Sequence, residues 1–178
     1  MSIARAVNVA LGASMLLASC GDDQALPADG GPCWPLKASP GGEVQLGTGQ
    51  IAFQPMPDTL AVVINGSQSD PFLEVHARIR GFPPGDPDNA FDPHNPKTKV
   101  SATIEALNLA LGVECPASLG YVAGPESGTY DMVHSLRIGL GLLPLGQVSG
   151  QQARITVEVV GSNSRTARDE KLVTLMVP

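Results

Sequence analysis

Aromatic and basic residues are scarce in this chain of 178 residues. One Trp, two Tyr and four Phe supply few rings, so an aromatic platform for stacking sugars is poorly provided for. The 11 basic residues are outnumbered by 17 acidic ones, and the formal net charge is −6. Because basic surfaces attract nucleic acids and anionic lipids, this balance argues against electrostatic binding to either.

Signature motifs of catalysis are also missing. The chain contains no GxSxG elbow, no HExxH pair, no SxxK pair and no Walker phosphate loop. Residues 47–52 match the dinucleotide string GxGxxA, which works only where a helix begins at the second glycine and holds pyrophosphate. Pro55 and Pro57 prevent such a helix, so we interpret this string as a turn between two short strands.

The first residues have the layout of a secretory signal peptide. Arg5 is the only charge before Asp22, and residues 6–19 are almost all apolar or small. This stretch is shorter than the ~20 apolar residues that a helix needs to span a bilayer. We therefore expect residues 1–19 to be a cleaved signal peptide. Loss of Arg5 leaves ten basic residues against 17 acidic ones, a net charge of −7.

The run Leu17-Ala18-Ser19-Cys20 resembles the lipobox of bacterial lipoproteins. The resemblance implies a diacylglycerol on the Cys20 thiol and cleavage just before it, which would anchor the chain in a bacterial cell envelope. Two or more acyl chains give stable membrane attachment. Gly21 stands where a sorting Asp would retain the protein in the inner membrane, so the resemblance implies the outer membrane. The alternative is ordinary cleavage, with Cys20 as a free thiol.

Two cysteines, Cys33 and Cys115, remain once Cys20 carries lipid. An even remainder outside the cytoplasm predicts one disulfide, which would contribute ~4 kcal/mol if unstrained. The alternatives are a metal site or two buried thiols. Wide spacing and the lack of a nearby CxxC or HxxxH pattern argue against a metal site.

The remaining chain divides into a tether and a folded domain. Residues 20–42 are rich in Gly, Pro and Asp and lack periodicity, which predicts a flexible tether. From residue 43 to 178, apolar and polar residues alternate in short runs, which predicts half-buried strands of antiparallel sheets. The total of 20 Gly and 16 Pro suits the turns between many short strands.

The clearest alternation covers residues 72–80. It places Leu73, Val75, Ala77 and Ile79 on an inward face, and Glu74, His76, Arg78 and Arg80 on an outward face. Similar patterns predict longer strands at 97–106, 130–140, 154–160 and 171–177, and shorter ones at 43–46, 51–54 and 60–64. The alternation in 130–140 puts His134 on the same face as Met132 and Leu136. Residues 104–111 also tolerate a helical turn or two.

About eight such strands predict an all-β fold, an antiparallel two-sheet sandwich. The closing pattern is a Val/Ile strand at 154–160, a Gly-Ser-Asn turn at 161–164, an Arg-rich loop and a last apolar strand. It resembles the last two strands of immunoglobulin-like domains on bacterial surfaces, although the Cys-Trp-Cys core signature of antibody domains is absent. The stretch 46–53, followed by the expected strands at 60–64 and 72–80, also resembles sequences of predicted bacterial lipoproteins that have no assigned activity.

The loop 85–96 is the most polar segment and suggests a calcium site. Its hard oxygen donors are those of Asp86, Asp88, Asn89 and Asp92. They do not follow the EF-hand order, and the alternative is a solvated loop in which Asp, Asn and Pro favour turns. The three histidines, His76, His94 and His134, are far apart in the sequence, which argues against a zinc triad.

These features predict a lipid-anchored binding or structural module of the cell envelope with no catalytic activity of its own. Its expected partners are the membrane, through the anchor, and an envelope protein or polysaccharide; nucleic acid is not expected. The alternative is a calcium-stabilised adhesion or carbohydrate-binding domain that uses residues 86–94. An envelope hydrolase is the third hypothesis, and it is weakened because no nucleophile–base pair is visible in the sequence.

Overall fold

The computed structural model describes residues 38–64, 70–112 and 115–178. The predicted signal peptide, Cys20, Cys33 and most of the predicted tether lie outside these ranges. The described residues form two mostly antiparallel β-sheets, an all-β sandwich, which confirms the fold class predicted from the alternation.

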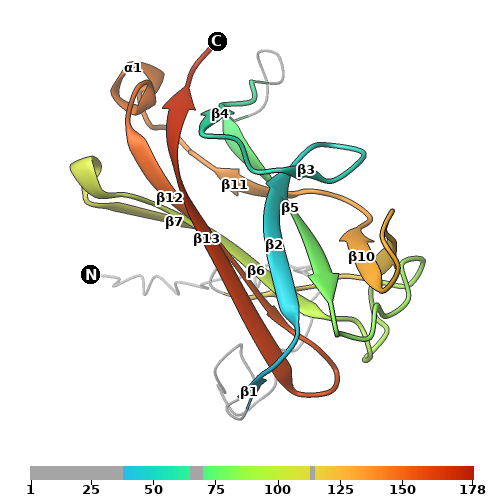
Figure 1. The fold of residues 1–178 in the computed structure, drawn as a ribbon. Helices are drawn as coiled ribbons and strands as arrows, with labels where there is room; N and C mark the ends of the chain where they lie inside the picture. Colours follow the sequence, from blue (N-terminus) through green and yellow to red (C-terminus); the bar gives the residue numbers. More distant parts are fainter. Residues whose placement is uncertain (1–37, 65–69, 113–114) are drawn as a thin grey trace, which may run out of the picture. The chain divides into compact units, whose positions relative to one another are not determined.

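The seven-stranded sheet is built around the last hairpin of the chain. Its neighbours run in the order β1 (Ser39–Pro40), β13 (Arg165–Met176), β12 (Gln152–Val160), β6 (Lys97–Ile104) and β7 (Leu109–Gly112). Two further strands join it, β4 (Thr59–Ala61) on β13 and β8 (Ala117–Ser118) on β6. In Figure 1 the strands β12, β13, β6 and β7 lie side by side in one layer.

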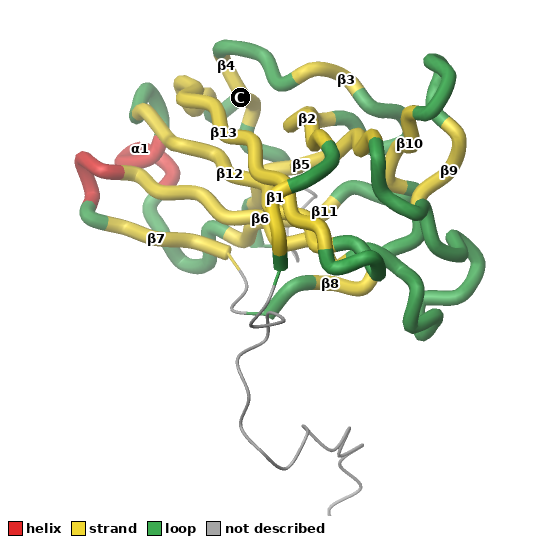
Figure 2. The backbone as a smooth tube through the Cα atoms, turned by 60° about the horizontal axis from the view of Figure 1, so that its bottom comes forward, coloured by secondary structure: helices red, strands yellow, loops and turns green. Residues whose placement is uncertain are grey.

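The six-stranded sheet has β5 at its centre. Its order is β3 (Gln54–Pro55), β2 (Glu43–Thr48), β5 (Phe72–Arg80), β10 (Thr129–Met132) and β9 (Tyr121–Ala123), and β11 (Leu136–Gly139) also pairs with β5. Figure 2 shows β2, β5 and β10 following a path separate from the layer of β13, β12 and β7. Within the ranges that the structure describes, the helices are the 3-10 turn η2 (Glu105–Leu107) and the single-turn α1 (Leu145–Val148).

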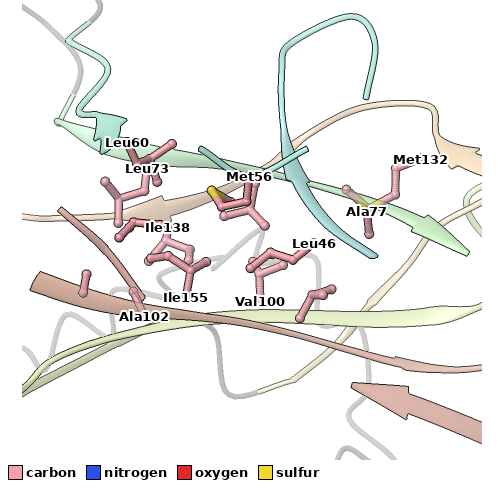
Figure 3. Packing of buried hydrophobic residues seen from close by; sticks show 14 of the residues in the cluster. Leu46, Met56, Leu60, Leu73, Ala77, Val100, Ala102, Met132, Ile138 and Ile155 are labelled. Atoms are coloured by element: carbon pink, nitrogen blue, oxygen red, sulfur yellow. The ribbon is translucent and has the colours of Figure 1, made fainter. Parts of the chain in front are cut away.

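The core lies between the two sheets, where the inward side chains meet. Leu73, Val75, Ala77 and Ile79 are fully buried, as the alternation predicted, and they face buried side chains of β6 and β12 such as Val100 (Figure 3). Each fully buried branched aliphatic side chain contributes about 1.5–3 kcal/mol relative to exposure. The β5, β6 and β12 alternation therefore supplies much of the apolar surface that holds the sandwich together.

The predicted strand 130–140 is wrong as a single strand. It consists of β10 and β11, which pair with opposite halves of β5 and are separated by residues 133–135, here called the strand break. His134, predicted on the inward face, is exposed within this break. The pattern could not reveal the break, because Met132 and Ile138 on either side of it keep the same inward phase.

Strand β13 begins earlier than predicted and has parallel neighbours. The expected Arg-rich loop is part of the strand, because residues 166–170 pair with β12. Their charged side chains form ion pairs with that strand, such as Arg168 with Glu158. β1 and β4 both pair with β13 in parallel, so the sheet is not purely antiparallel. Residues 39–40, assigned to the tether by composition, are therefore part of this sheet.

The short elements follow local sequence. Residues 104–111, which tolerate a helical turn, form η2 and then β7, and Asn108 joins the two with a positive φ of 48°. Gly47 and Thr48 end β2, and residues 49–53 form the turn that leads to β3. The expected strand at 51–54 is wrong, because only Gln54 of it belongs to β3. The expected strand 60–64 is reduced to β4 and one bridge between Val63 and Phe72.

Candidate functional site

The outward row of β5 is the most unusual polar surface of the described chain. Alternation predicts that Glu74, His76 and Arg78 point to solvent, but only 7% of Glu74 and none of His76 is exposed. His76 does lie on the outward row of β5, as predicted, but its side chain is buried instead of exposed to solvent. Side chains from outside β5 cover this row, and together with it they form the β5 cluster: Phe53, Glu74, His76, Arg78, Asp131 and Ser135.

Phe53 can cover His76 because β2, the strand beside β5, has no side chain at the position next to His76. Gly47 of β2 is the register partner of His76, and a Cβ at Gly47 would collide with the Phe53 ring. The turn after β2 folds this ring back over β5, where it meets His76 edge-on at 5.9 Å between ring centroids. The Arg78 guanidinium lies 4.3 Å from the same ring centroid, a cation–π contact.

His76 is buried without hydrogen bonds. Neither its Nδ1 nor its Nε2 has a hydrogen-bond partner among the described residues. Buried polar groups normally have partners, so an orphaned imidazole calls for a physical explanation. Burial lowers the pKa of His76 and outweighs the opposing effects of the Ala77 backbone and of the Asp131 and Glu74 carboxylates, so the folded protein favours the neutral ring.

Arg78 and Asp131 neutralise each other beside this histidine. They are register partners on β5 and β10, and Arg78 donates from Nε at 2.6 Å and from a terminal nitrogen at 3.0 Å to the two carboxylate oxygens. This two-pronged bond to Asp131 raises the pKa of Arg78. The pair therefore closes one side of the β5 cluster with little net charge.

The other side of the cluster opens into a hollow. Ser135 in the strand break donates a hydrogen bond of 2.8 Å to Glu74. A hollow of about 550 Å³ lies beside them and is lined by Gln50, Ile51, Glu74, His134, Ser135 and Arg137. Ile51 is 92% exposed at its rim. This region can present a carboxylate, an imidazole and a guanidinium to a ligand at the same place.

The predicted calcium loop is organised by Asn95, which sequence reasoning did not single out. Asn95 is 2% exposed; its Oδ1 accepts from the Asp86 amide at 2.7 Å and its Nδ2 donates to the Asn89 carbonyl at 2.7 Å. Gly85 has a φ of +73°, and a Cβ there would collide with Asn95. The loop therefore wraps around one buried amide side chain.

Three of the four predicted calcium ligands also bind backbone within this loop. Asp86, Asn89 and Asp92 each accept from the amide two residues ahead, at 2.8–3.0 Å. Asp92 in addition bonds the His94 ring at 2.9 Å, and its bonds to the His94 backbone and ring lower its pKa. In the described ranges no three His, Cys, Asp or Glu side chains are placed to hold a metal. Calcium binding by Asp86, Asp88, Asn89 and Asp92 stays a prediction.

The remaining predicted site residues are the cysteines. Cys115 is disulfide-bonded. Its predicted partner, Cys33, and the predicted lipidation site, Cys20, lie outside the described residues, so the pairing and the anchor stay predictions. Phe53, Asp131 and Ser135 were missed by sequence reasoning because each reaches β5 from another strand or turn, and no local pattern signals such a contact.

Comparison with models of known protein families, with curated proteins and with solved structures found no match. Within the described part of the chain, no helix has the length and apolar character needed to cross a membrane.

Proposed function

We propose that this chain is a lipid-anchored binding module of the bacterial cell envelope, without catalytic activity of its own, whose contact surface is the hollow beside β5. The lipobox-like run ending at Cys20 supports the anchor, and the sandwich supports a rigid carrier for loops. The hollow carries the binding proposal, because exposed Ile51 stands at its rim beside the nearly buried Glu74.

The strand order supports the immunoglobulin-like part of this proposal. In immunoglobulin-type sandwiches, strands A, B, E and D form one sheet and strands C′, C, F and G form the other. With the letters assigned along the chain, the neighbours β2, β5, β10 and β9 of one sheet correspond to A, B, E and D. The neighbours β7, β6, β12 and β13 of the other sheet correspond to C′, C, F and G. Such domains present contact surfaces on loops and exposed sheet faces.

Site-specific photo-cross-linking in intact envelopes tests the contact surface. A photoreactive residue at position 51 should give a discrete cross-linked product with an envelope protein or polysaccharide. The control places the same residue at position 142, because Leu142 is 97% exposed but does not line the hollow. Equal labelling from both positions, or none from position 51, would contradict the proposed surface.

A further inference from the structure

The segment that covers His76 is weakly attached to the rest of the domain. Residues 48–56 pair with β2 at only two positions, Gly47 with Pro55 and Thr48 with Gln54. Three further bonds hold the ends of the segment: the Thr48 hydroxyl donates to the Glu74 carbonyl at 3.0 Å, the Met56 amide donates to the Leu46 carbonyl at 3.3 Å, and Lys171 donates to the Met56 carbonyl at 2.7 Å. Its middle, around Gln50 and Ile51, is exposed. Met56 anchors the end of the segment in the core, and Phe53 is the buried apolar contact between the rest of the segment and the outward row of β5.

The contact between Phe53 and His76 suits a neutral imidazole ring. The Phe53 ring contacts the imidazole edge-on. On the β10 and β11 side of β5, the strand break leaves His76 and Ala77 without register partners. Neither imidazole nitrogen makes a hydrogen bond of good geometry to another described residue, and the Ala77 backbone is the only nearby backbone group that favours the charged ring. A protonated ring has two N–H donors, so full satisfaction of both requires water. Water can reach His76 only if the covering segment moves.

The charges that face His76 do not remove this conflict. On β5 its neighbours are Glu74, already bonded to Ser135, and Arg78; on β10 it faces Asp131, which Arg78 holds. The strand break adds the exposed His134, and residues 48–56 contain no ionisable side chain. The Ala77 backbone and the two carboxylates favour a charged imidazole, Arg78 opposes it, and burial dominates the balance.

We propose that His76 is a pH-sensitive latch, which holds residues 48–56 against β5 while neutral and releases them when protonated. Release moves Phe53 off the imidazole, hydrates both ring nitrogens and widens the hollow between Ile51 and Glu74. The latch depends on neither the lipid anchor nor the proposed binding partner, because every contact in it lies within the described sandwich.

The direction of the pH dependence follows from proton linkage. In the closed protein the pKa of His76 is below its ordinary value of 6.5, whereas an opened segment exposes the ring to water. The open state therefore binds one more proton at mildly acidic pH. The equilibrium constant for opening is therefore lowest above pH 6.5. Below pH 6.5 it rises by up to about tenfold for each unit by which the pH falls.

Hydrogen exchange of the full chain at pH 7.5 and pH 5.5 tests the latch. After correction for intrinsic exchange rates, protection of amides in residues 48–56 should be lower at pH 5.5, by at most about tenfold. Amides in the middle of β12 should keep their protection. Equal protection of residues 48–56 at both pH values would overturn the proposal, and so would a parallel loss across β12, which would indicate global unfolding.

Two variants complete the experiment. His76→Leu fills the same apolar space without a titratable group, so exchange in residues 48–56 should lose its pH dependence. His134→Gln removes the exposed histidine of the strand break and should behave as the unmodified chain does. If His76→Leu fails to fold, the wild-type comparison still decides the matter. If folded His76→Leu loses as much protection at pH 5.5 as the unmodified chain, the assignment to His76 is overturned.

Discussion

At the scale of single residues, the surroundings of a side chain outweigh its place in an alternating pattern. His76 belongs to the outward row of β5 and is completely buried, whereas His134 belongs to an inward phase and is exposed. The first inversion arises because Gly47 leaves space that Phe53 fills, and the second because the strand breaks at 133–135. The first cause lies in segments distant from His76 in the sequence, and the second is a break in strand pairing around His134 itself.

Asn95 offers a sharp test at this scale. Asn95→Ala removes both hydrogen bonds of the buried amide and leaves the Asp86 amide without its acceptor, so we expect a loss of about 1–3 kcal/mol in unfolding free energy. Urea unfolding followed by circular dichroism measures the loss. Asn163→Ala is the matched control, because Asn163 accepts one bond from the Arg165 amide in an exposed turn. A loss no larger than that of the control would refute the organising role of Asn95.

At the scale of elements, strands whose two faces differ were predicted closely. The predicted strand at 72–80 coincides with β5, and those at 97–106 and 154–160 match β6 and β12 to within a few residues. β13 was predicted too short, because its charged residues resemble a loop until Arg168 and Glu170 find partners on the neighbouring strand β12. Predictions failed where pairing, rather than amphipathic pattern, determines the strand.

The loop 85–96 carries the prediction that belongs to this scale. If Asp86, Asp88, Asn89 and Asp92 bind calcium, millimolar calcium should raise the melting temperature of the chain, and chelator should reverse the change, because ligand binding stabilises the folded state. The variant Asp88→Asn should weaken the effect, since it removes one charged ligand. An identical melting temperature in calcium and in chelator would exclude the calcium-stabilised alternative, with magnesium as the control for ionic strength.

At the scale of the whole molecule, the sandwich brings together segments that are far apart in the sequence. Leu46 donates its amide to Asp169 at 2.8 Å, and Lys171 donates to the Met56 carbonyl at 2.7 Å, so the beginning and the end of the domain are joined across the sheets. Cys115 adds a covalent link through its disulfide. If Cys33 is its partner, the link ties the predicted tether to the middle of the domain.

The predicted anchor is tested on the complete chain in a bacterial host. Cys20→Ser should move the protein from the membrane fraction to the soluble fraction and abolish labelling by a radioactive fatty acid, because the thiol is the expected lipid acceptor. Cys33→Ser is the control, since it removes a cysteine outside the lipobox-like run and should stay in the membrane fraction. Unchanged membrane association of Cys20→Ser would rule out the anchor.

The sequence by itself determined the fold class, because a two-residue apolar period in β5, β6 and β12 leaves a sheet with one buried face as the stable arrangement. It also supplied the expectation of an anchor at Cys20, which is a local motif. Only the tertiary structure decided which polar side chains meet. The cover of Phe53 on His76 and the bond of Ser135 to Glu74 depend on strand register and on a break that no local pattern encodes.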